Sequence, residues 1–389
     1  MDEILIKACG VTYRKGQYIT GVGRSTLELM KALSKINNLP FKLYYYTTGL
    51  RANNMDRTDI DFQYFKIPFP DKIIHITELD VLYRKYILRP NLVHIPHNYD
   101  DSYKEENLLL TIHDVWGYKN ITRLKSKNLD KFRQNELGFI FQDFNFTNKK
   151  EKKKWERAVY NASCIVTCSQ YSKSMIEETF NLPCSKVVSI PWGISSDFNK
   201  VSPAILSECK TRLNLPSRYF LSVSCSHPRK NIETLIKAFI QFNSKKREHK
   251  LVLVWSNPSI LNLCQKNIEN SDIIFLKYIS DKDLVSVYNG ATATFFPTRY
   301  EGFGFPILES FACNTPVVTC RNTSLPEVGG NIALYTDEDG VDEMSYYMEL
   351  FENENFDLHL FREQAKNYIK RFSWENTALQ YVELYKSLL

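Results

Sequence analysis

The repeated alternation of short apolar, β-branched or aromatic runs with amphipathic stretches of helical length constrains the fold of this sequence most strongly. Strands that alternate with helices in this way are typical of parallel α/β sheets. We expect strands at residues 5–11, 41–47, 92–95, 108–112, 164–167, 187–190, 219–223, 251–255, 273–276, 292–297 and 316–319. We expect helices at residues 25–36, 172–180, 231–242, 281–289, 306–313 and 373–389.

The strands fall into two series, separated by a polar stretch at residues 193–216 that shows no strand pattern. We therefore predict two doubly wound α/β domains, with bounds at residues 1–195, 196–217 (a linker), 218–372 and 373–389 (a terminal amphipathic helix). Ligands of such sheets bind beyond the carboxyl ends of the strands, and the space between two domains is the default site. Functional residues are thus expected in loops that directly follow strands.

Composition excludes several classes of protein. The 389 residues are 43% hydrophobic and 24% charged, which is ordinary for a globular protein and unlike a collagen-like or disordered chain. No apolar run approaches the roughly 18 to 20 residues of a spanning helix, and the acidic start of the chain does not resemble a signal peptide. The nine cysteines are scattered without a C-x-x-C pair, so we expect reduced thiols, a cytoplasmic protein and no zinc site.

Positive charge is concentrated in one segment. Residues 119–157 carry 12 Lys/Arg and 5 Asp/Glu, net +7, whereas the whole chain has net charge +6. Phenylalanines and Trp155 are interleaved with these bases, a combination that suits the anionic inner face of a membrane or a nucleic-acid backbone. A solvated helix face above a small core would give the same pattern. Because no recognition module accompanies the segment, we expect peripheral membrane contact and no nucleic acid.

Two loops of the first series carry residues suited to ligand binding. Gly21 and Gly23 precede the first expected helix, where glycines allow close approach and the helix N-terminus offers free N–H groups. Thr26 stands where a dinucleotide-binding fingerprint would need its third glycine. His113, followed by Asp114, comes after an apolar strand and could donate a hydrogen bond to a sugar hydroxyl or exchange a proton. A plain tight turn and a structural histidine are the respective alternatives.

Two loops of the second series carry charge. Arg229 and Lys230 lie between a strand and a helix, where a guanidinium and an ammonium could clamp a diphosphate, although a solvated basic turn has the same composition. The segment at residues 296–309 contains two glycines, several aromatic residues and a proline suited to the first turn of a helix. Its Glu301 and Glu309 could accept hydrogen bonds from two sets of hydroxyls, as in a nucleotide sugar. Two solvated glutamates are the alternative.

Taken together and in order, these segments resemble the retaining glycosyltransferases of family 4, over nearly the whole chain. The resemblance rests on residues 300–309, with further matches at residues 21–24, 113–114, 228–231, 312–318, 324–328 and 372–375. It implies the GT-B fold, in which two Rossmann-like domains face each other across a cleft and a terminal helix crosses back to the first domain. It also implies a hexosyltransferase that needs no metal and no cofactor.

The variants of the Gly-Val-Gly-Arg and His-Asp motifs resemble those of bacterial mannosyltransferases of surface-polysaccharide assembly. GDP-mannose is therefore the first candidate for the donor, ahead of a UDP-hexose, and the acceptor would be a glycan or a lipid-linked glycan. Transfer would occur on the front face of the sugar, and the departing phosphate oxygen would take the acceptor proton. A nucleotide-sugar epimerase or a phosphorylase would use the same cleft without a glycan acceptor.

The resemblance also implies roles for single residues. Arg229 and Lys230 would neutralise the departing diphosphate, Glu301 would hold hydroxyls of the donor sugar, and Glu309 would bind the ribose. His113 would contact the donor sugar, partly through its backbone carbonyl. The further donor-binding positions are Gly21, Gly23, Gly302, Phe303, Gly304, Phe305 and Glu327.

The sequence departs from the family pattern in two places. The arginine that many relatives carry near Ser224 and Cys225 is missing, so Arg229 would take its place. Trp192 stands where relatives usually have asparagine.

Overall fold

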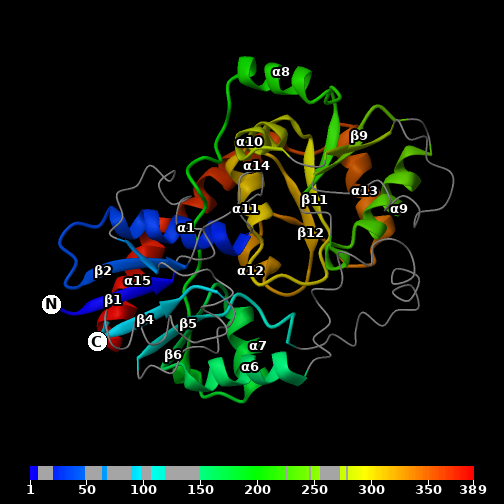
Figure 1. Cartoon of the computed structure of the whole chain (residues 1–389). Coiled ribbons are helices and arrows are strands. Elements are labelled where there is room, and N and C mark those ends of the chain that lie inside the picture. The colour runs from blue at the N-terminus through cyan, green and yellow to red at the C-terminus, as the bar shows by residue number, and fades with distance from the viewer. Residues whose placement is uncertain are drawn as a thin grey trace. The chain divides into compact units, whose positions relative to one another are not determined.

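The computed structural model describes residues 1–7, 21–48, 64–67, 89–97, 107–118, 149–223, 227–244, 247–254, 272–276 and 279–389. The chain forms two compact units (Figure 1), unit 1 being Met1–Trp192 with Trp374–Leu389, and unit 2 being Gly193–Ser373. The stretch at residues 196–217, expected to be a linker, lies within unit 2 and contains helix α8 (Pro203–Arg212). Ser202 caps this helix by accepting a hydrogen bond from the amide of Ile205.

Unit 1 is built on a parallel sheet of seven strands in the order β3-β2-β1-β4-β5-β6-β7. Its strands are β1 (Glu3–Lys7), β2 (Lys42–Thr48), β3 (Tyr64–Ile67), β4 (Leu92–Ile95), β5 (Leu108–Thr111), β6 (Cys164–Thr167) and β7 (Val187–Ser189). Its described helices are α1 (Gly21–Ser34), α6 (Lys149–Asn161), α7 (Gln170–Phe180), the 3-10 helix η5 (Cys184–Lys186) and α15 (Trp374–Leu388).

Helices cover both faces of this sheet. Successive strand residues point to opposite faces, and one set, including Val93 and Leu108, packs with Trp155 of α6 and Ile176 of α7. On the other face, α1 and α15 pack together. His94 of β4 faces α15, where its Nδ1 lies 2.8 Å from the hydroxyl of Tyr385. The last helix of the chain is therefore part of the core of unit 1.

Unit 2 is built on a parallel sheet of six strands in the order β10-β9-β8-β11-β12-β13. Its strands are β8 (Tyr219–Ser222), β9 (Lys250–Val254), β10 (Ile273–Leu276), β11 (Ala293–Phe296), β12 (Val317–Cys320) and β13 (Leu334–Thr336). Its described helices, besides α8, are η6 (Pro228–Lys230), α9 (Ile232–Asn243), α10 (Asp281–Gly290), α11 (Phe305–Ala312), α12 (Leu325–Gly329), α13 (Val341–Glu352), α14 (Leu358–Tyr368) and η8 (Ile369–Arg371).

The core of unit 2 shows the same division between two faces. Phe220 and Phe295 pack with α9 and α13, whereas the neighbouring Tyr219 and Leu221 pack with α10. Figure 1 shows α9 and α13 on one side of strands β11 and β12, and α10 and α11 on the other. The prediction of two doubly wound parallel α/β domains is confirmed. Among the described residues, no helix is both long enough and apolar enough to cross a membrane.

Candidate active site

The charged residues expected in unit 2 lie beyond the carboxyl ends of β8 and β11. Arg229 and Lys230 form η6, and Asn231 then adopts a left-handed conformation (φ 57°) before α9 begins. The side chain of Asn231 donates a hydrogen bond to the carbonyl of Glu338, at 2.5 Å. Glu301 lies in the loop between β11 and α11. β8 and β11 are parallel neighbours in the sheet. The loops that follow them therefore meet at the carboxyl-terminal ends of the strands.

The two cations converge on a single carboxylate oxygen. Oε1 of Glu301 accepts hydrogen bonds from Arg229 (2.5 Å), from Nζ of Lys230 (2.6 Å) and from the hydroxyl of Thr298 (3.0 Å). No described residue donates to Oε2 of Glu301. The side chains are largely buried, with exposures of 23% for Arg229, 10% for Lys230 and 12% for Glu301. One face of the carboxylate is thus anchored, and the other is left as an acceptor.

The electrostatics of this cluster favour an anionic ligand. Burial would raise the pKa of Glu301, but the charges of Arg229 and Lys230 outweigh it and hold that pKa below its ordinary value. Two cations and one carboxylate leave a net charge of +1. Burial, together with the same two cations, lowers the pKa of nearby His227 to about 3. His227 is therefore neutral at pH 7, and its Nδ1 accepts a hydrogen bond from the amide of Arg229.

Backbone contacts fix the two loops to each other. The amide of Arg299 donates to the carbonyl of Arg229 (2.7 Å), and the guanidinium of Arg229 donates to the carbonyl of Tyr300 (2.7 Å). The hydroxyl oxygen of Thr298 also lies 3.1 Å from the carbonyl oxygen of Arg229 and 3.2 Å from that of Tyr300, so its single proton is shared between these acceptors and Glu301. Thr298 was not singled out in the sequence, although it stands only three residues before Glu301. Its three contacts make it part of the support for the cluster.

The segment that follows Glu301 turns into α11 as the sequence predicts. Gly304 has φ +119°, a conformation that favours glycine, and a Cβ there would lie 3.1 Å from Leu325. A proline follows in the first turn of α11, as expected. Gly302 and Phe303 are buried, and the Phe303 ring lies edge-on to Phe305 at 5.3 Å. These residues pack around the turn, and their contact with a donor stays a prediction.

Glu309 lies on the inner side of α11 and is 4% exposed. Its Oε2 accepts a hydrogen bond of 2.7 Å from the hydroxyl of Tyr288, a fully buried residue of α10. Tyr288 was missed in the sequence because nothing in its local pattern distinguishes it from a core tyrosine. The structure brings Arg229, Lys230 and Glu301 into direct contact and gives Glu309 a separate partner.

Glu327 differs from the other two glutamates because it is exposed, on the short helix α12. The residues just before this helix support the Glu301 loop. The hydroxyl of Ser324 donates to the carbonyl of Phe303 (2.7 Å), and its oxygen also lies 3.1 Å from the carbonyl oxygen of Glu301. The segment around α12 therefore holds the loop in place, and a direct donor contact of Glu327 stays a prediction.

In unit 1, His113 follows β5 and is buried. Its Nε2 lies 3.2 Å from the carbonyl oxygen of Pro96. Because a carbonyl can only accept, Nε2 carries the proton and Nδ1 is the acceptor of the neutral ring. Burial lowers the pKa of His113 to about 4, although the hydrogen bond to Pro96 opposes the shift. At pH 7 the ring is therefore neutral, and the hydrogen bond that it was expected to donate to a sugar hydroxyl goes to the carbonyl of Pro96 instead.

The backbone carbonyl of His113, a predicted sugar contact, already accepts a hydrogen bond of 3.1 Å from the hydroxyl of Ser172. The thiol of Cys168 also donates to this carbonyl, at 3.6 Å, so the carbonyl has two donors within unit 1 and its contact with a sugar stays a prediction. The ring of His113 lies 5.0 Å from that of Trp192, which in turn stacks at 6.5 Å on Trp374. The unusual Trp192 thus packs between His113 and the start of α15.

The structure of the Gly21–Gly23 motif differs from the loop that the sequence predicts. It forms the first turn of α1 rather than a loop before the helix, because α1 begins at Gly21. A Cβ at Gly21 would meet nothing within 4 Å, so space alone does not require glycine there. Ser25 and Thr26 both donate side-chain hydrogen bonds to the carbonyl of Val22. The amides of this turn remain suited to an anion by their place at a helix N-terminus.

Comparison with known proteins places both units in glycosyltransferase families. Residues 19–198 match the model described as Glycosyltransferase Family 4, and residues 208–371 match that of Glycosyl transferases group 1. The chain is 26% identical to O-antigen chain mannosyltransferase B of Escherichia coli, over 95% of this chain and 97% of that protein. It is 30% identical to O-antigen chain mannosyltransferase RfbU of Salmonella typhimurium, over 54% of this chain and 56% of that protein.

The fold also resembles that of solved glycosyltransferase structures. The crystal structure of Anabaena HepE in complex with UDP-glucose has a TM-score of 0.70 and 15% identity, and covers 99% of each chain. At this identity the comparison shows the fold alone.

Proposed function

Because this chain belongs to the GT-B glycosyltransferases that join a family 4 domain to a group 1 domain, we propose that it transfers a mannosyl group from GDP-mannose to an O-antigen glycan or its lipid-linked precursor. Both relatives described above are named O-antigen chain mannosyltransferases, which supports mannose as the sugar and O-antigen as the acceptor. A UDP-hexose is the second candidate for the donor. The chain acts as a hexosyltransferase in either case.

The observation that carries the proposal is the sharing of Glu301 by Arg229 and Lys230. Their common contact with Oε1 preorganises two cations at the carboxyl edge of the sheet, where a diphosphate would bind. Oε2 of Glu301 is left to accept a hydrogen bond from a hydroxyl of the donor sugar. A single cluster thus offers charge to the phosphates and an acceptor to the sugar.

The same cluster suggests how the reaction is assisted. Negative charge on the diphosphate grows as the bond to the sugar breaks, and prepositioned cations stabilise it with little reorganisation. We propose that Arg229 and Lys230 provide this charge without a metal ion or a cofactor. The departing phosphate oxygen takes the acceptor proton, so the new bond forms on the same face and the anomeric configuration is retained. Glu301 is committed to the two cations, so we do not assign it as a covalent nucleophile.

The direct test incubates the full chain with radiolabelled GDP-mannose or UDP-glucose and a lipid-linked O-antigen acceptor. We expect label to enter the acceptor from GDP-mannose, with retained configuration by NMR and no loss of rate in EDTA. Glu301→Gln should abolish transfer, whereas the control Glu233→Gln, which changes a half-buried ion-pair residue of α9, should not. Label that becomes an isomeric nucleotide sugar, or a sugar phosphate without acceptor, would instead identify an epimerase or a phosphorylase.

A further inference from the structure

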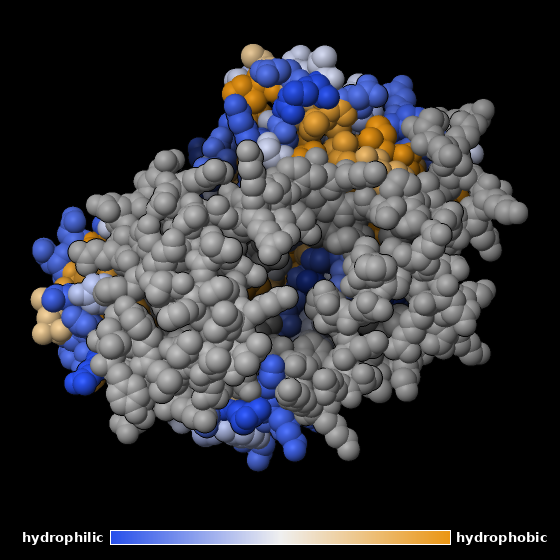
Figure 2. Space-filling model, in the orientation of Figure 1, coloured by the Kyte–Doolittle hydropathy of each residue, from blue (hydrophilic) through white to orange (hydrophobic). Residues whose placement is uncertain are grey.

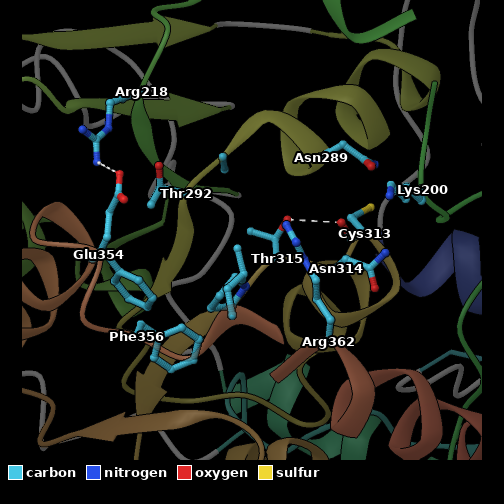
Figure 3. A pocket seen from close by; sticks show the side chains of 14 residues that line it. Lys200, Arg218, Asn289, Thr292, Cys313, Asn314, Thr315, Glu354, Phe356 and Arg362 are labelled. Atoms are coloured by element: carbon cyan, nitrogen blue, oxygen red, sulfur yellow. Dashed lines mark hydrogen bonds and ion pairs between the residues drawn. The ribbon is translucent and has the colours of Figure 1, made fainter. Parts of the chain in front are cut away.

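We propose that unit 2 contains a second ligand site, for a small molecule that carries a phosphate group on a ring. The site is a pocket of about 490 Å³, shown in Figure 3. Arg218, Thr292 and Pro316 line it, and these residues precede β8, β11 and β12. Arg229 and Glu301 follow β8 and β11. The pocket therefore lies at the amino-terminal ends of these strands, and the candidate active site lies at their carboxyl-terminal ends.

The charge of the pocket is positive. Its lining includes Lys200, Arg218 and Arg362 but a single carboxylate, Glu354. Arg218 is engaged with Glu354 at 3.5 Å and with Glu248 at 3.3 Å. Within the described part of the chain, neither Lys200 nor Arg362 has an acidic partner. Two cations are therefore available to an anion.

The arrangement of polar groups matches a phosphate. Figure 3 shows Lys200, Asn314 and Arg362 on one side of the pocket, and Arg218, Glu354 and Phe356 on the other. Asn314 has a left-handed backbone (φ 58°) at the end of α11. An arginine, a lysine and an amide that face one space supply the donors that bind phosphate oxygens.

An apolar wall faces the cations and indicates a ligand with a ring. Phe351 and Phe356, whose ring centroids are 4.9 Å apart, line the pocket together with Leu358 and Pro316. The volume lies within the range of about 300 to 1,000 Å³ that is typical of small-molecule sites. A hexose phosphate combines the size, the apolar ring face and the anion that the lining suits.

The pocket is also connected to Glu309 through two hydrogen bonds. Thr315, which lines it, donates a hydrogen bond of 2.7 Å to the carbonyl of Tyr288, and Tyr288 holds Glu309 through its hydroxyl. A competing explanation is that the cations only complement the carbonyls at the ends of α10 and α11, which close on this pocket. That explanation predicts stabilisation of the helices without ligand binding.

Calorimetry on the full chain separates these explanations. We expect a hexose 6-phosphate to bind to the wild type in the presence of saturating GDP. It should bind equally well to Lys230→Ala, which changes a residue at the opposite ends of the strands. Arg362→Gln and Lys200→Gln should each weaken this binding about tenfold or more. Lys366→Gln, an exposed change on the same helix as Arg362 but outside the pocket, should leave it unchanged.

Inorganic phosphate and an unphosphorylated hexose serve as the further probes. If both probes bind more weakly than the hexose phosphate does, the site recognises the phosphate group and the sugar ring together. The proposal is overturned if wild type gives no heat of binding with the hexose phosphate, if the free hexose binds equally well, or if Lys230→Ala removes the binding. These outcomes do not depend on whether the chain transfers mannose.

Discussion

One oxygen of Glu301 binds both Arg229 and Lys230, so this residue positions the two cations of the candidate active site and neutralises only part of their charge. We predict that Arg229→Ala and Lys230→Ala each lower turnover about ten- to hundredfold, because charge on the leaving group grows in the transition state. Affinity for the free nucleoside should change much less. Turnover and nucleoside affinity are compared for each variant, with Lys237→Ala, an exposed ion-pair change on α9, as the control. Normal turnover, or equal losses in both quantities, would contradict the role.

The hydrogen bond from Tyr288 to Glu309 leads to a second prediction at the residue scale. Tyr288→Phe keeps the ring, which lies edge-on to Phe198 at 6.0 Å, and removes the hydroxyl that donates to Glu309. If Glu309 binds the ribose, donor affinity should fall about three- to tenfold, since a single hydrogen bond typically contributes about 0.5 to 1.5 kcal/mol. Tyr219→Phe is the matched control, because its buried hydroxyl donates to the carbonyl of Val287 instead. Donor binding by calorimetry that is equal in both variants would sink the assignment.

These residues also show what the sequence could predict of the site. Glu301 and Glu309 stand out because their spacing and the glycines between them are local features. Tyr288 and Thr298 do not, because their contacts depend on how α10 and the loop after β11 come together. The ion pairs of Glu301 could be expected as charges of opposite sign in one cleft. Their convergence on one oxygen is a property of the fold.

At the scale of elements, strands were predicted more reliably than helices. The strand at residues 164–167 was placed correctly because a buried parallel strand is a continuous apolar run. The sequence of helix α6 has mainly the pattern of a charge run, because its exposed lysines obscure the buried Trp155. The helix predicted from Ser25 begins earlier, at Gly21, because the two glycines, which ordinarily indicate a loop, lie in its first turn. The division of the chain lies at Trp192, and the polar stretch after it folds as α8.

His94, which connects α15 with β4 and β5, predicts that the stability of the protein depends on pH. His94 bridges Tyr385 of α15 and Thr111 of β5, each at 2.8 Å. Burial, together with neighbouring His97 and His113, lowers the pKa of His94 to about 3 from the usual 6.5. As the pH falls below about 6.5, the unfolded chain binds a proton that the folded chain rejects. Stability should therefore fall by about 1.4 kcal/mol per pH unit for this histidine.

Urea unfolding of the full chain between pH 7 and pH 5 measures this dependence. His94→Gln should flatten the fall in the free energy of unfolding, whatever its effect at pH 7. His359→Gln, on the exposed side of α14, is the control and should preserve the slope. An unchanged slope in His94→Gln would show that the buried histidine is not responsible.

At the scale of the whole molecule, the charge is unevenly distributed along the chain. The segment at residues 119–157 has net charge +7 against +6 for the entire chain. Residues 119–148 lie outside the described residues, and with them the phenylalanines expected to insert into a membrane: Phe139, Phe141, Phe144 and Phe146. The end of the segment forms α6, where Trp155 is buried and Lys152 and Lys153 are exposed. Figure 2 shows hydrophilic side chains at the lower edge of the view, where Figure 1 places α6.

We propose that this basic segment holds the protein against an anionic membrane and so presents a lipid-linked acceptor. Each Lys or Arg close to an anionic surface contributes about 1 kcal/mol, attenuated by salt, so several together give reversible association. The chain should float with anionic vesicles at low salt and be released at high salt. Flotation should be lost on substitution by Gln of Lys149, Lys150, Lys152, Lys153 and Lys154, whereas transfer to a soluble acceptor analogue should persist. The control set in unit 2, which should still float, is Lys210, Lys237, Lys282, Lys366 and Lys370. If wild type ignores anionic vesicles at low salt, the charge of α6 only solvates the helix, and a soluble glycan becomes the better acceptor.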